Sequence, residues 1–342
     1  MDQQAALRWV QANIGRFGGN PHDVTIAGQS AGGLSVLAHL ISPGSRGLFQ
    51  RAIIESGSFA LNQQSLATAE AAGQDFAAKA GCPDQTARCL RQLPVADLVT
   101  PSFVEIPGVI DGRVLTESFG TALAAGRFAR VPILNGSNHD EELIFVVGLH
   151  VAVSGGTFVP VPDEPVTTDN YQNDIAAVLG VPAARAAAIA AVYPPGAYPL
   201  PALGLSTLVG DANFACPALQ MDKWTSARVP TFAYEFNDAT APQRFASGLP
   251  AAPTHSSETQ YLFDLPNAPV PATFNAGQQA LAASMRTAWA NFAGIGNPAS
   301  AAVPWPAFSG ADTAPMLSLV PPQPQVETDF AAQHHCSFWA AG

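Results

Sequence analysis

Short apolar runs alternate with stretches of helical periodicity along the first part of the chain. Apolar residues recur at the spacing of one helix face over residues 6–14, and glycines then end the pattern. Residues 23–27 and 51–55 are short β-branched or apolar runs, typical of buried parallel strands. The apolar run at 34–41 between them predicts a helix. This order of strand, helix and strand predicts a mainly parallel sheet.

The same alternation continues toward the C-terminus. Residues 131–135 and 231–236 predict two further strands, and residues 276–293 predict a long amphipathic helix. An Ala- and Gln-rich stretch at 61–98 predicts helix. Residues 150–210, rich in Ala, Pro and Gly, predict short helices and loops inserted over the sheet. We therefore expect an α/β fold.

Composition narrows the class of protein. The chain has 342 residues, 48% of them hydrophobic and 12% charged, which suffices for one α/β domain over residues 1–342. A net charge of −11 argues against nucleic acid and anionic membranes as partners. No apolar run reaches the ~20 residues that a membrane span requires. The first residues also lack the basic and apolar regions of a signal peptide.

A candidate nucleophile lies between the first predicted strand and the helix after it. Residues 28–32, Gly-Gln-Ser-Ala-Gly, match Gly-x-Ser-x-Gly, which places its serine on a sharp, strained turn. We expect Gly28 and Gly32 to be small so that neighbouring backbone can approach. The N–H of Ala31, at the positive end of the helix, would face a developing oxyanion. Ser30 is therefore the predicted nucleophile.

A serine nucleophile needs a general base and an acid that orients the base. In α/β-hydrolases the order along the chain is serine, acid, histidine. This order favours His255 among the seven histidines, which are His22, His39, His139, His150, His255, His334 and His335. The candidate acids, just after the strand at 131–135, are Asp140, Glu141 and Glu142. A solvated acidic turn is the alternative interpretation of these three carboxylates.

These segments resemble the type B carboxylesterase family, which includes cholinesterases and fungal lipases. The resemblance covers essentially the whole chain, and residues 6–32 are similar to the family's serine signature. Residues 136–141 resemble its acid segment and select Glu141, although Glu142 stands where the family usually has glycine. Residues 254–258 resemble its His-x-x-Glu segment and select His255. The resemblance implies an α/β-hydrolase fold, with Ser58 and Glu258 supporting the site through hydrogen bonds.

The four cysteines are Cys82, Cys89, Cys216 and Cys336. Without a Cys-x-x-Cys motif they argue against zinc, which leaves two disulfides or four buried thiols. The family resemblance implies the pairs Cys82–Cys89 and Cys216–Cys336. Disulfides in turn imply an exported protein, secreted or periplasmic.

The resemblance implies hydrolysis of a small-molecule carboxylic ester through an acyl-enzyme, with no metal or organic cofactor. It also implies that the family's N-terminal portion, which carries a His-Gly-Gly-Gly-type loop and the first strands, precedes the point where this chain starts. We accordingly expect Ala31 to be the only backbone oxyanion donor and the nucleophile strand to have an unpaired edge. On this view the chain alone is unstable and weakly active. A truncated inactive esterase and a non-catalytic cholinesterase-like binding domain are the alternatives.

Overall fold

A six-stranded sheet forms the centre of the molecule. The computed structural model describes residues 1–99, 108–146, 151–154, 157–160, 165–243, 251–270 and 272–341. The strand order is β1-β2-β5-β8-β9-β10, in which the first five strands are parallel and β10 is antiparallel to β9. The strands are β1 (Thr25–Gln29), β2 (Arg51–Glu55), β5 (Ile133–Asn138), β8 (Thr231–Phe236), β9 (Met316–Leu319) and β10 (Gln325–Glu327). The mainly parallel sheet predicted from the sequence is confirmed.

Helices and two small sheets account for the other described elements. The helices are α1 (Asp2–Asn13), α2 (Ala31–Ile41), α3 (Leu66–Lys79), α4 (Ala87–Gln92), α5 (Val95–Val99), α6 (Phe119–Ala124), α7 (Leu143–Val146), α8 (Tyr171–Leu179), α9 (Ala183–Val192), α10 (Pro201–Gly210), α11 (Cys216–Ser226), α12 (Thr259–Leu262), α13 (Ala276–Ile295), α14 (Phe330–Gln333) and α15 (Cys336–Ala340). Single turns are η1 (Ile14–Phe17), η2 (Pro43–Ser45), η3 (Pro195–Ala197) and the π-helical η4 (Asp211–Ala215). The short strands pair as β3 (Gln64–Ser65) with β4 (Val109–Ile110) and β6 (Val151–Ser154) with β7 (Thr157–Pro160).

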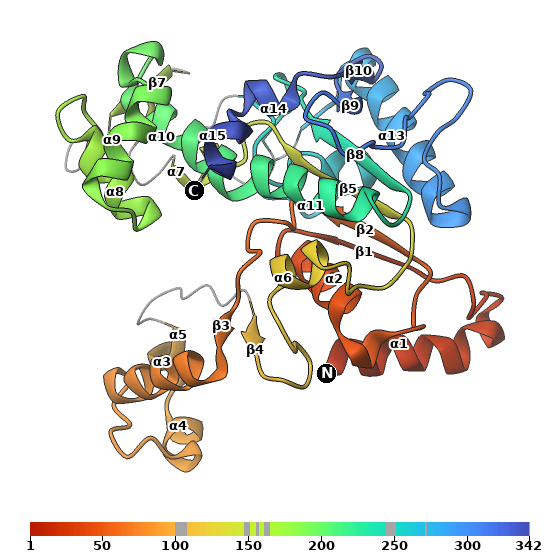
Figure 1. Ribbon diagram of the computed structural model, residues 1–342, viewed down its shortest axis with the longest axis horizontal. Coiled ribbons are helices and arrows are strands. Elements are labelled where there is room, and N and C mark those ends of the chain that lie inside the picture. Colours follow the sequence, from red (N-terminus) through yellow and green to blue (C-terminus); the bar gives the residue numbers. More distant parts are fainter. Residues whose placement is uncertain are drawn as a thin grey trace.

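Helices cover both faces of the large sheet (Figure 1). Successive strand residues point to opposite faces, so neighbours in β2 belong to different cores. Ile53 packs with Leu281 and Phe292 of α13 on one face. Ile54 packs with Leu37 of α2 and with helix α6 on the other. Both faces are therefore apolar, as a parallel sheet requires.

The predicted elements match the observed ones with shifted bounds. The strands predicted at 51–55 and 231–236 coincide with β2 and β8, whereas β1 and β5 begin two residues later than predicted. The helical stretch at 61–98 is divided into α3, α4 and α5: Gly81, with a positive φ of 92°, and Pro83 lie between α3 and α4, and Pro94 lies between α4 and α5. The pattern missed β9 and β10, which are too short to show a period. β1 lies at the edge of the sheet among the described strands, as expected.

Helices α8, α9 and α10 form a group beside one end of the sheet (Figure 1). Their buried residues make a separate apolar cluster that includes Ile175, Ile189 and Leu208. They lie in the 150–210 stretch predicted as helices and loops, which also contains the β6–β7 hairpin; residues 150, 155–156 and 161–164 lie outside the described part. Within the described ranges no single helix has the length and apolarity of a membrane span, and only the pair 171–179 and 183–197, bent by 114°, meets those criteria together.

Two disulfides join the four cysteines. Cys82 and Cys89 close the loop between α3 and α4, with their Cα atoms 5.8 Å apart. Cys216 at the start of α11 bonds Cys336 at the start of α15, with Cα atoms 5.2 Å apart. Both pairings implied by the resemblance are confirmed, and the free-thiol alternative is excluded. Two disulfides are typical of proteins that fold in an oxidising compartment.

Candidate active site

Ser30 occupies a strained turn between β1 and α2. Its backbone has φ 56° and ψ −123°, a conformation that costs a residue with a side chain roughly 1–3 kcal/mol. The Ser30 N–H donates to the Glu55 carbonyl at 2.8 Å, which ties the turn to β2. The strand-turn-helix setting predicted for this serine is therefore present.

Two glycines allow this turn to pack closely. A Cβ added at Gly28 would lie 2.3 Å from the backbone of Gly32, and one at Gly33 would lie 2.8 Å from the Cα of Gly57. A Cβ at Gly32 would meet open space, so our expectation that this position must be small is wrong. The reason is that α2 approaches the β2 end through Gly33, one residue further along.

Glu141 and His255 meet although they are far apart in the sequence. His255 Nδ1 lies 2.6 Å from Glu141 Oε2, and the two residues are 7% and 1% exposed. The turn after β5 carries Glu141, and a backbone bridge between Asp140 and Thr254 holds that turn against the His255 loop. The geometry thus selects Glu141, of the three candidate acids, as the partner of His255.

Asn138, the last residue of β5, holds this pair in place. Its N–H donates to Glu141 Oε1 at 2.7 Å, and its side-chain amide donates to the Thr254 carbonyl at 2.7 Å and to Glu258 Oε2. Burial, together with the nearby Glu55 and Glu141, raises the pKa of Glu258 to about 8. Glu258 thus contacts the residue that holds the pair, and its supporting role stays a prediction. Sequence reasoning missed Asn138, whose only signal was its place at a strand end.

The second nitrogen of His255 faces Gln29, the residue before Ser30. Nε2 lies 3.2 Å from the Gln29 side-chain amide nitrogen. Among the described residues, which include both side chains, no hydrogen bond joins the Ser30 hydroxyl to His255. A donating Gln29 amide assigns Nε2 as the acceptor and leaves the ring proton on Nδ1, facing Glu141. This is the tautomer that a general base needs, and sequence reasoning missed Gln29.

Electrostatics around His255 favour protonation. Burial lowers the pKa of His255, but the Glu141 carboxylate and its hydrogen bond outweigh burial, so the pKa is raised above its ordinary value of 6.5. Phe145 and Phe214 flank the ring, with centroids 5.4 and 5.3 Å away. The base therefore lies against an apolar wall that the sequence analysis did not identify.

Ala31 and Ser58 have separate places near the turn. Ala31 is the first residue of α2, and its neighbour Ser30 makes no side-chain hydrogen bond that would cap this helix. Ser58 donates to Asn135 Oδ1 at 3.1 Å, and the Asn135 amide donates to Asp222 at 3.0 Å. These contacts connect β5 to α11, and among the described residues no hydrogen bond joins Ser58 to Ser30, Glu141 or His255. Its supporting role stays a prediction.

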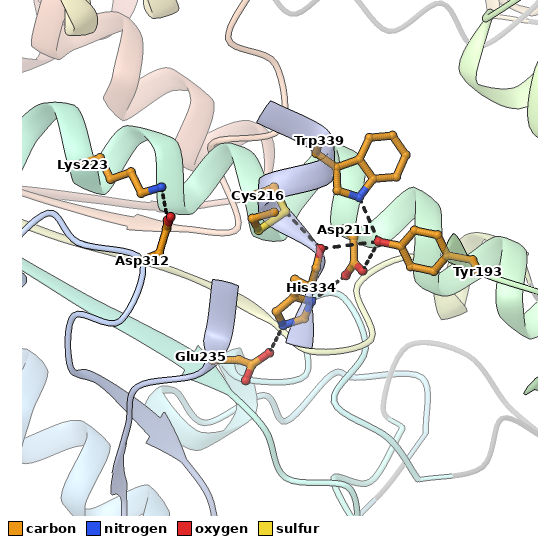
Figure 2. The surroundings of a disulfide bond; sticks show 9 residues. Tyr193, Asp211, Cys216, Lys223, Glu235, Asp312, His334 and Trp339 are labelled. Carbon is orange, nitrogen blue, oxygen red and sulfur yellow. Dashed lines mark hydrogen bonds and ion pairs between the residues drawn. A yellow bond between two sulfur atoms is a disulfide. The ribbon is translucent and has the colours of Figure 1, made fainter. Parts of the chain in front are cut away.

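A second buried histidine lies in a separate polar network (Figure 2). His334 Nδ1 contacts Asp211 Oδ1 at 2.5 Å and its Nε2 contacts Glu235 Oε1 at 2.8 Å. Burial lowers the pKa of His334, but the two carboxylates outweigh it and raise the pKa to about 10. His139 Nδ1 contacts the same Glu235 oxygen at 2.8 Å. His150 lies outside the described residues.

Comparisons with known proteins agree with these segments. A protein-family model described as "Carboxylesterase family" matches residues 1–339 of this chain. Acylcarnitine hydrolase of Rattus norvegicus is 32% identical over 99% of this chain and 61% of its own length, and that of Mus musculus is 33% identical over 94% and 58%. Pyrethroid hydrolase Ces2e of Rattus norvegicus is 31% identical over 94% and 57%. The chain spans about three fifths of the length of these relatives.

Proposed function

The chain belongs to the carboxylesterase family, whose α/β-hydrolase fold its sheet matches, and on that basis we propose that it hydrolyses a carboxylic ester through an acyl-enzyme. The observation that carries the proposal is the buried 2.6 Å contact between Glu141 and His255. The other side of the His255 ring contacts Gln29, which is the residue before Ser30 in the sequence. Such a histidine, oriented by a carboxylate and free of a proton on Nε2, is the general base that a serine nucleophile needs.

In the proposed reaction Ser30 Oγ attacks the ester carbonyl while His255 Nε2 accepts the hydroxyl proton. Glu141 holds the ring orientation and stabilises the imidazolium that forms. The Ala31 N–H donates to the oxyanion at the α2 N-terminus. His255 then protonates the departing alcohol, and water repeats the sequence on the acyl-enzyme. Ser58 and Glu258 support the site through Asn135 and Asn138.

Gln29 gives this reaction a preceding step. Its amide lies against His255 Nε2, which is the atom that must accept the Ser30 proton. The Ser30 hydroxyl therefore has to replace Gln29 as the partner of Nε2 before attack. Catalytic hydrogen bonds often form only when substrate is bound.

The apolar wall beside His255 indicates the kind of ester. Phe145 is 48% exposed, so an apolar acyl or alcohol group of a small substrate can contact it beside the base. Relatives are named as hydrolases of acylcarnitine and of pyrethroids, which are esters with apolar parts. We propose a small-molecule carboxylic ester for this chain as well. The two disulfides support secretion or export to the periplasm.

A fluorophosphonate probe, which reacts with activated serines, tests the proposal. We expect the chain to be labelled and to hydrolyse p-nitrophenyl butyrate slowly, because the Ala31 N–H is the only backbone oxyanion donor proposed for it. Ser30→Ala should lose both the labelling and the hydrolysis, while the exposed control Ser309→Ala keeps both. Circular dichroism checks that each variant is folded. Labelling of Ser30→Ala would contradict the nucleophile assignment. A folded chain that takes no label would instead favour the non-catalytic alternatives.

A further inference from the structure

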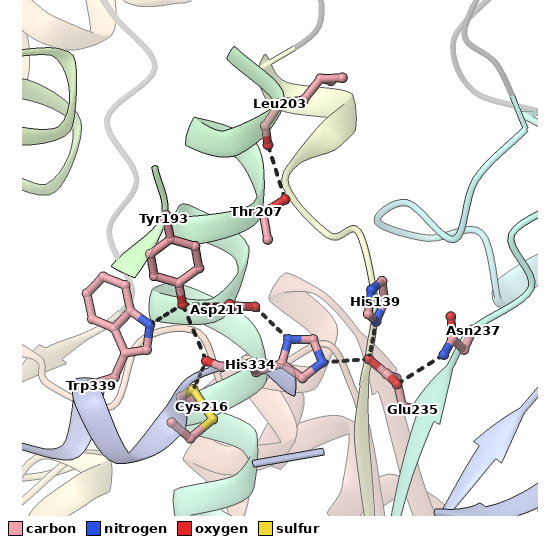
Figure 3. Close-up of polar contacts among 11 residues, drawn as sticks. His139, Tyr193, Leu203, Thr207, Asp211, Cys216, Glu235, Asn237, His334 and Trp339 are labelled. Atoms are coloured by element: carbon pink, nitrogen blue, oxygen red, sulfur yellow. Dashed lines mark hydrogen bonds and ion pairs between the residues drawn. A yellow bond between two sulfur atoms is a disulfide. The ribbon is translucent and has the colours of Figure 1, made fainter. Parts of the chain in front are cut away.

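Three possible metal ligands meet beside β8, in a group we call the two-histidine cluster: His139, Glu235 and His334 (Figure 3). They come from the turn after β5, from β8 and from the residue after α14. Glu235 and His334 are buried, and the His139 side chain is 35% exposed. The cluster is separate from the Glu141–His255 pair and takes no part in the reaction proposed above.

The donor atoms are close enough to share one ion. Both imidazoles approach the same oxygen, Glu235 Oε1, at 2.8 Å, and the three ligand atoms all lie within 4.8 Å of one another. Tetrahedral Zn²⁺ with bonds of about 2.1 Å places its ligand atoms about 3.4 Å apart. Small side-chain movements therefore reach that geometry. The His139 side chain is 35% exposed, so an ion can reach the cluster from that side.

Hydrogen bonds from neighbouring side chains orient His334, as residues that bond to the ligands of a metal site commonly do. Asp211 accepts from His334 Nδ1, which directs Nε2 toward Glu235. Tyr193 donates to the other Asp211 oxygen at 2.7 Å, and Trp339 donates to the Tyr193 oxygen at 2.9 Å (Figure 2). This chain of hydrogen bonds fixes His334 before any ion arrives.

Charge also favours a cation here. Asp211 and Glu235 both contact His334, and the carboxyl groups of Asp140 and Glu327 act electrostatically on the same residues. One Glu327 oxygen is buried without a hydrogen-bond partner among the described residues. Burial and the nearby Glu235 raise the pKa of Glu327 to about 8, so the negative charge in contact with His334 comes from Asp211 and Glu235.

We propose that His139, Glu235 and His334 bind one divalent transition-metal ion, for which Zn²⁺ is the best match to two imidazoles and a carboxylate. The ion would join the turn that carries Glu141 to the C-terminal segment. The ligands lie 96 and 99 positions apart, so no sequence motif marks them. The spacing of the cysteines argued against zinc, but all four cysteines are in disulfides and contribute no ligand.

A proton is the competing occupant. A protonated His334 supplies positive charge to Asp211 and Glu235 without any metal, and the network is then a buried ion pair. The two occupants differ in one measurable respect. Only a metal site would take up Zn²⁺ with fixed stoichiometry, and only in a metal site would that uptake depend on His139. Of the two carboxylates that contact His334, His139 contacts only Glu235.

The test uses the full chain, stripped with a chelator and dialysed at pH 8, where proton competition is weaker than at pH 7. Zn²⁺ alone is titrated against a chromophoric chelator, and Co²⁺ provides an absorption spectrum that reports tetrahedral coordination. We expect one Zn²⁺ per chain and a rise in the unfolding temperature with added Zn²⁺. Absence of stoichiometric binding would overturn the proposal and leave the protonated network as the explanation.

Variants decide whether the bound ion is at this cluster. We expect His139→Ala and the near-isosteric Glu235→Gln each to weaken Zn²⁺ binding by at least about 100-fold, and Asp211→Asn by about 10–100-fold. The exposed His22→Ala is the matched control and should bind as the unchanged chain does. Binding that survives both His139→Ala and Glu235→Gln would overturn the assignment. Labelling by the serine probe is followed in parallel, so failure of this proposal is distinguishable from failure of the esterase proposal.

Discussion

Among the described residues, two buried histidines contact carboxylates, and they are held in opposite ways. His255 contacts a carboxylate through Nδ1 only, and its Nε2 faces the neutral Gln29 amide. His334 contacts a carboxylate through each nitrogen, Asp211 on one side and Glu235 on the other. Both arrangements raise the histidine pKa above its ordinary value, and two carboxylates raise that of His334 to about 10.

The difference separates a base from a fixed cation. A general base needs one nitrogen without a proton near the working pH, and a single carboxylate at the other nitrogen provides the correct tautomer. In the metal-free protein, two carboxylates stabilise the doubly protonated ring, so neither nitrogen is open to accept a further proton. The second carboxylate therefore converts the same side chain from a reagent into a structural element.

The largest expected effect is on hydrolysis. We expect His255→Ala to reduce kcat by about 10²–10⁴-fold, because the Ser30 hydroxyl then has no base. The measurement is the hydrolysis of p-nitrophenyl butyrate by chelator-treated protein. The exposed His22→Ala is the control and should retain the rate. Equal losses in His255→Ala and His22→Ala would mean that His255 is not the general base.

Loss of the His334 side chain should affect stability more than it affects hydrolysis. We expect His334→Gln to lower the free energy of unfolding by about 3–5 kcal/mol, because it leaves Asp211 and Glu235 buried without a cation. Urea denaturation in the presence of chelator measures this change. His139→Gln, which removes only one contact from Glu235 at a part-exposed site, should cost clearly less. A His334→Gln protein as stable as the unchanged chain would show that this network carries little energy.

Alkaline pH should weaken the fold through His334. Its pKa is about 10 in the folded protein and 6.5 in the unfolded chain, so only the folded state binds the proton between these values. The stabilisation is complete below pH 6.5 and is lost as the pH rises through 10. Glu258, whose folded pKa is raised to about 8, changes stability in the same direction. The free energy of unfolding of metal-free protein should fall from pH 7 to 10, and less steeply in His334→Gln.

The smallest expected effect is on the pH profile. Because the pKa of His255 is raised, the acid limb of kcat/KM should have its midpoint above pH 6.5. NMR titration of the His255 ring in Ser30→Ala reads the same group directly. Adding Glu141→Gln should move that midpoint to lower pH, whereas Glu142→Gln, a weaker contributor, should move it much less. An unmoved midpoint in Glu141→Gln would argue against Glu141 as the orienting carboxylate.

The sequence predicted the sheet class and most of its strands because buried parallel strands have a local signature. Runs such as 51–55 and 231–236 are long enough to show it, and they coincide with β2 and β8. The strands β9 and β10 have only four and three residues, which is too few for a period. The disulfide pairs followed from the family resemblance, since spacing alone left the thiol alternative open.

In the candidate site, too, features set by neighbouring residues could be predicted from the sequence, and contacts between distant residues could not. Ser30 and its turn were evident in the sequence, because the turn restricts residues that are adjacent along the chain. Ser30 has a positive φ, and the backbone packs so closely at Gly28 that no side chain fits there. Glu141 and His255 are 114 positions apart, and their pairing depended on the resemblance until the structure brought them within 2.6 Å. Asn138 and Gln29, which contact this pair, carry no local signal of their role.

By itself the sequence determined the strained serine turn, the parallel strands on either side of it and the residues able to act as acid and base. Only the tertiary structure decided which carboxylate each histidine contacts, and hence that His255 keeps an open nitrogen while His334 does not. The physical reason is range. Backbone preferences and side-chain periodicity act between neighbours, whereas a hydrogen bond between residues 99 or 114 positions apart exists only after the order of the strands has brought their ends together.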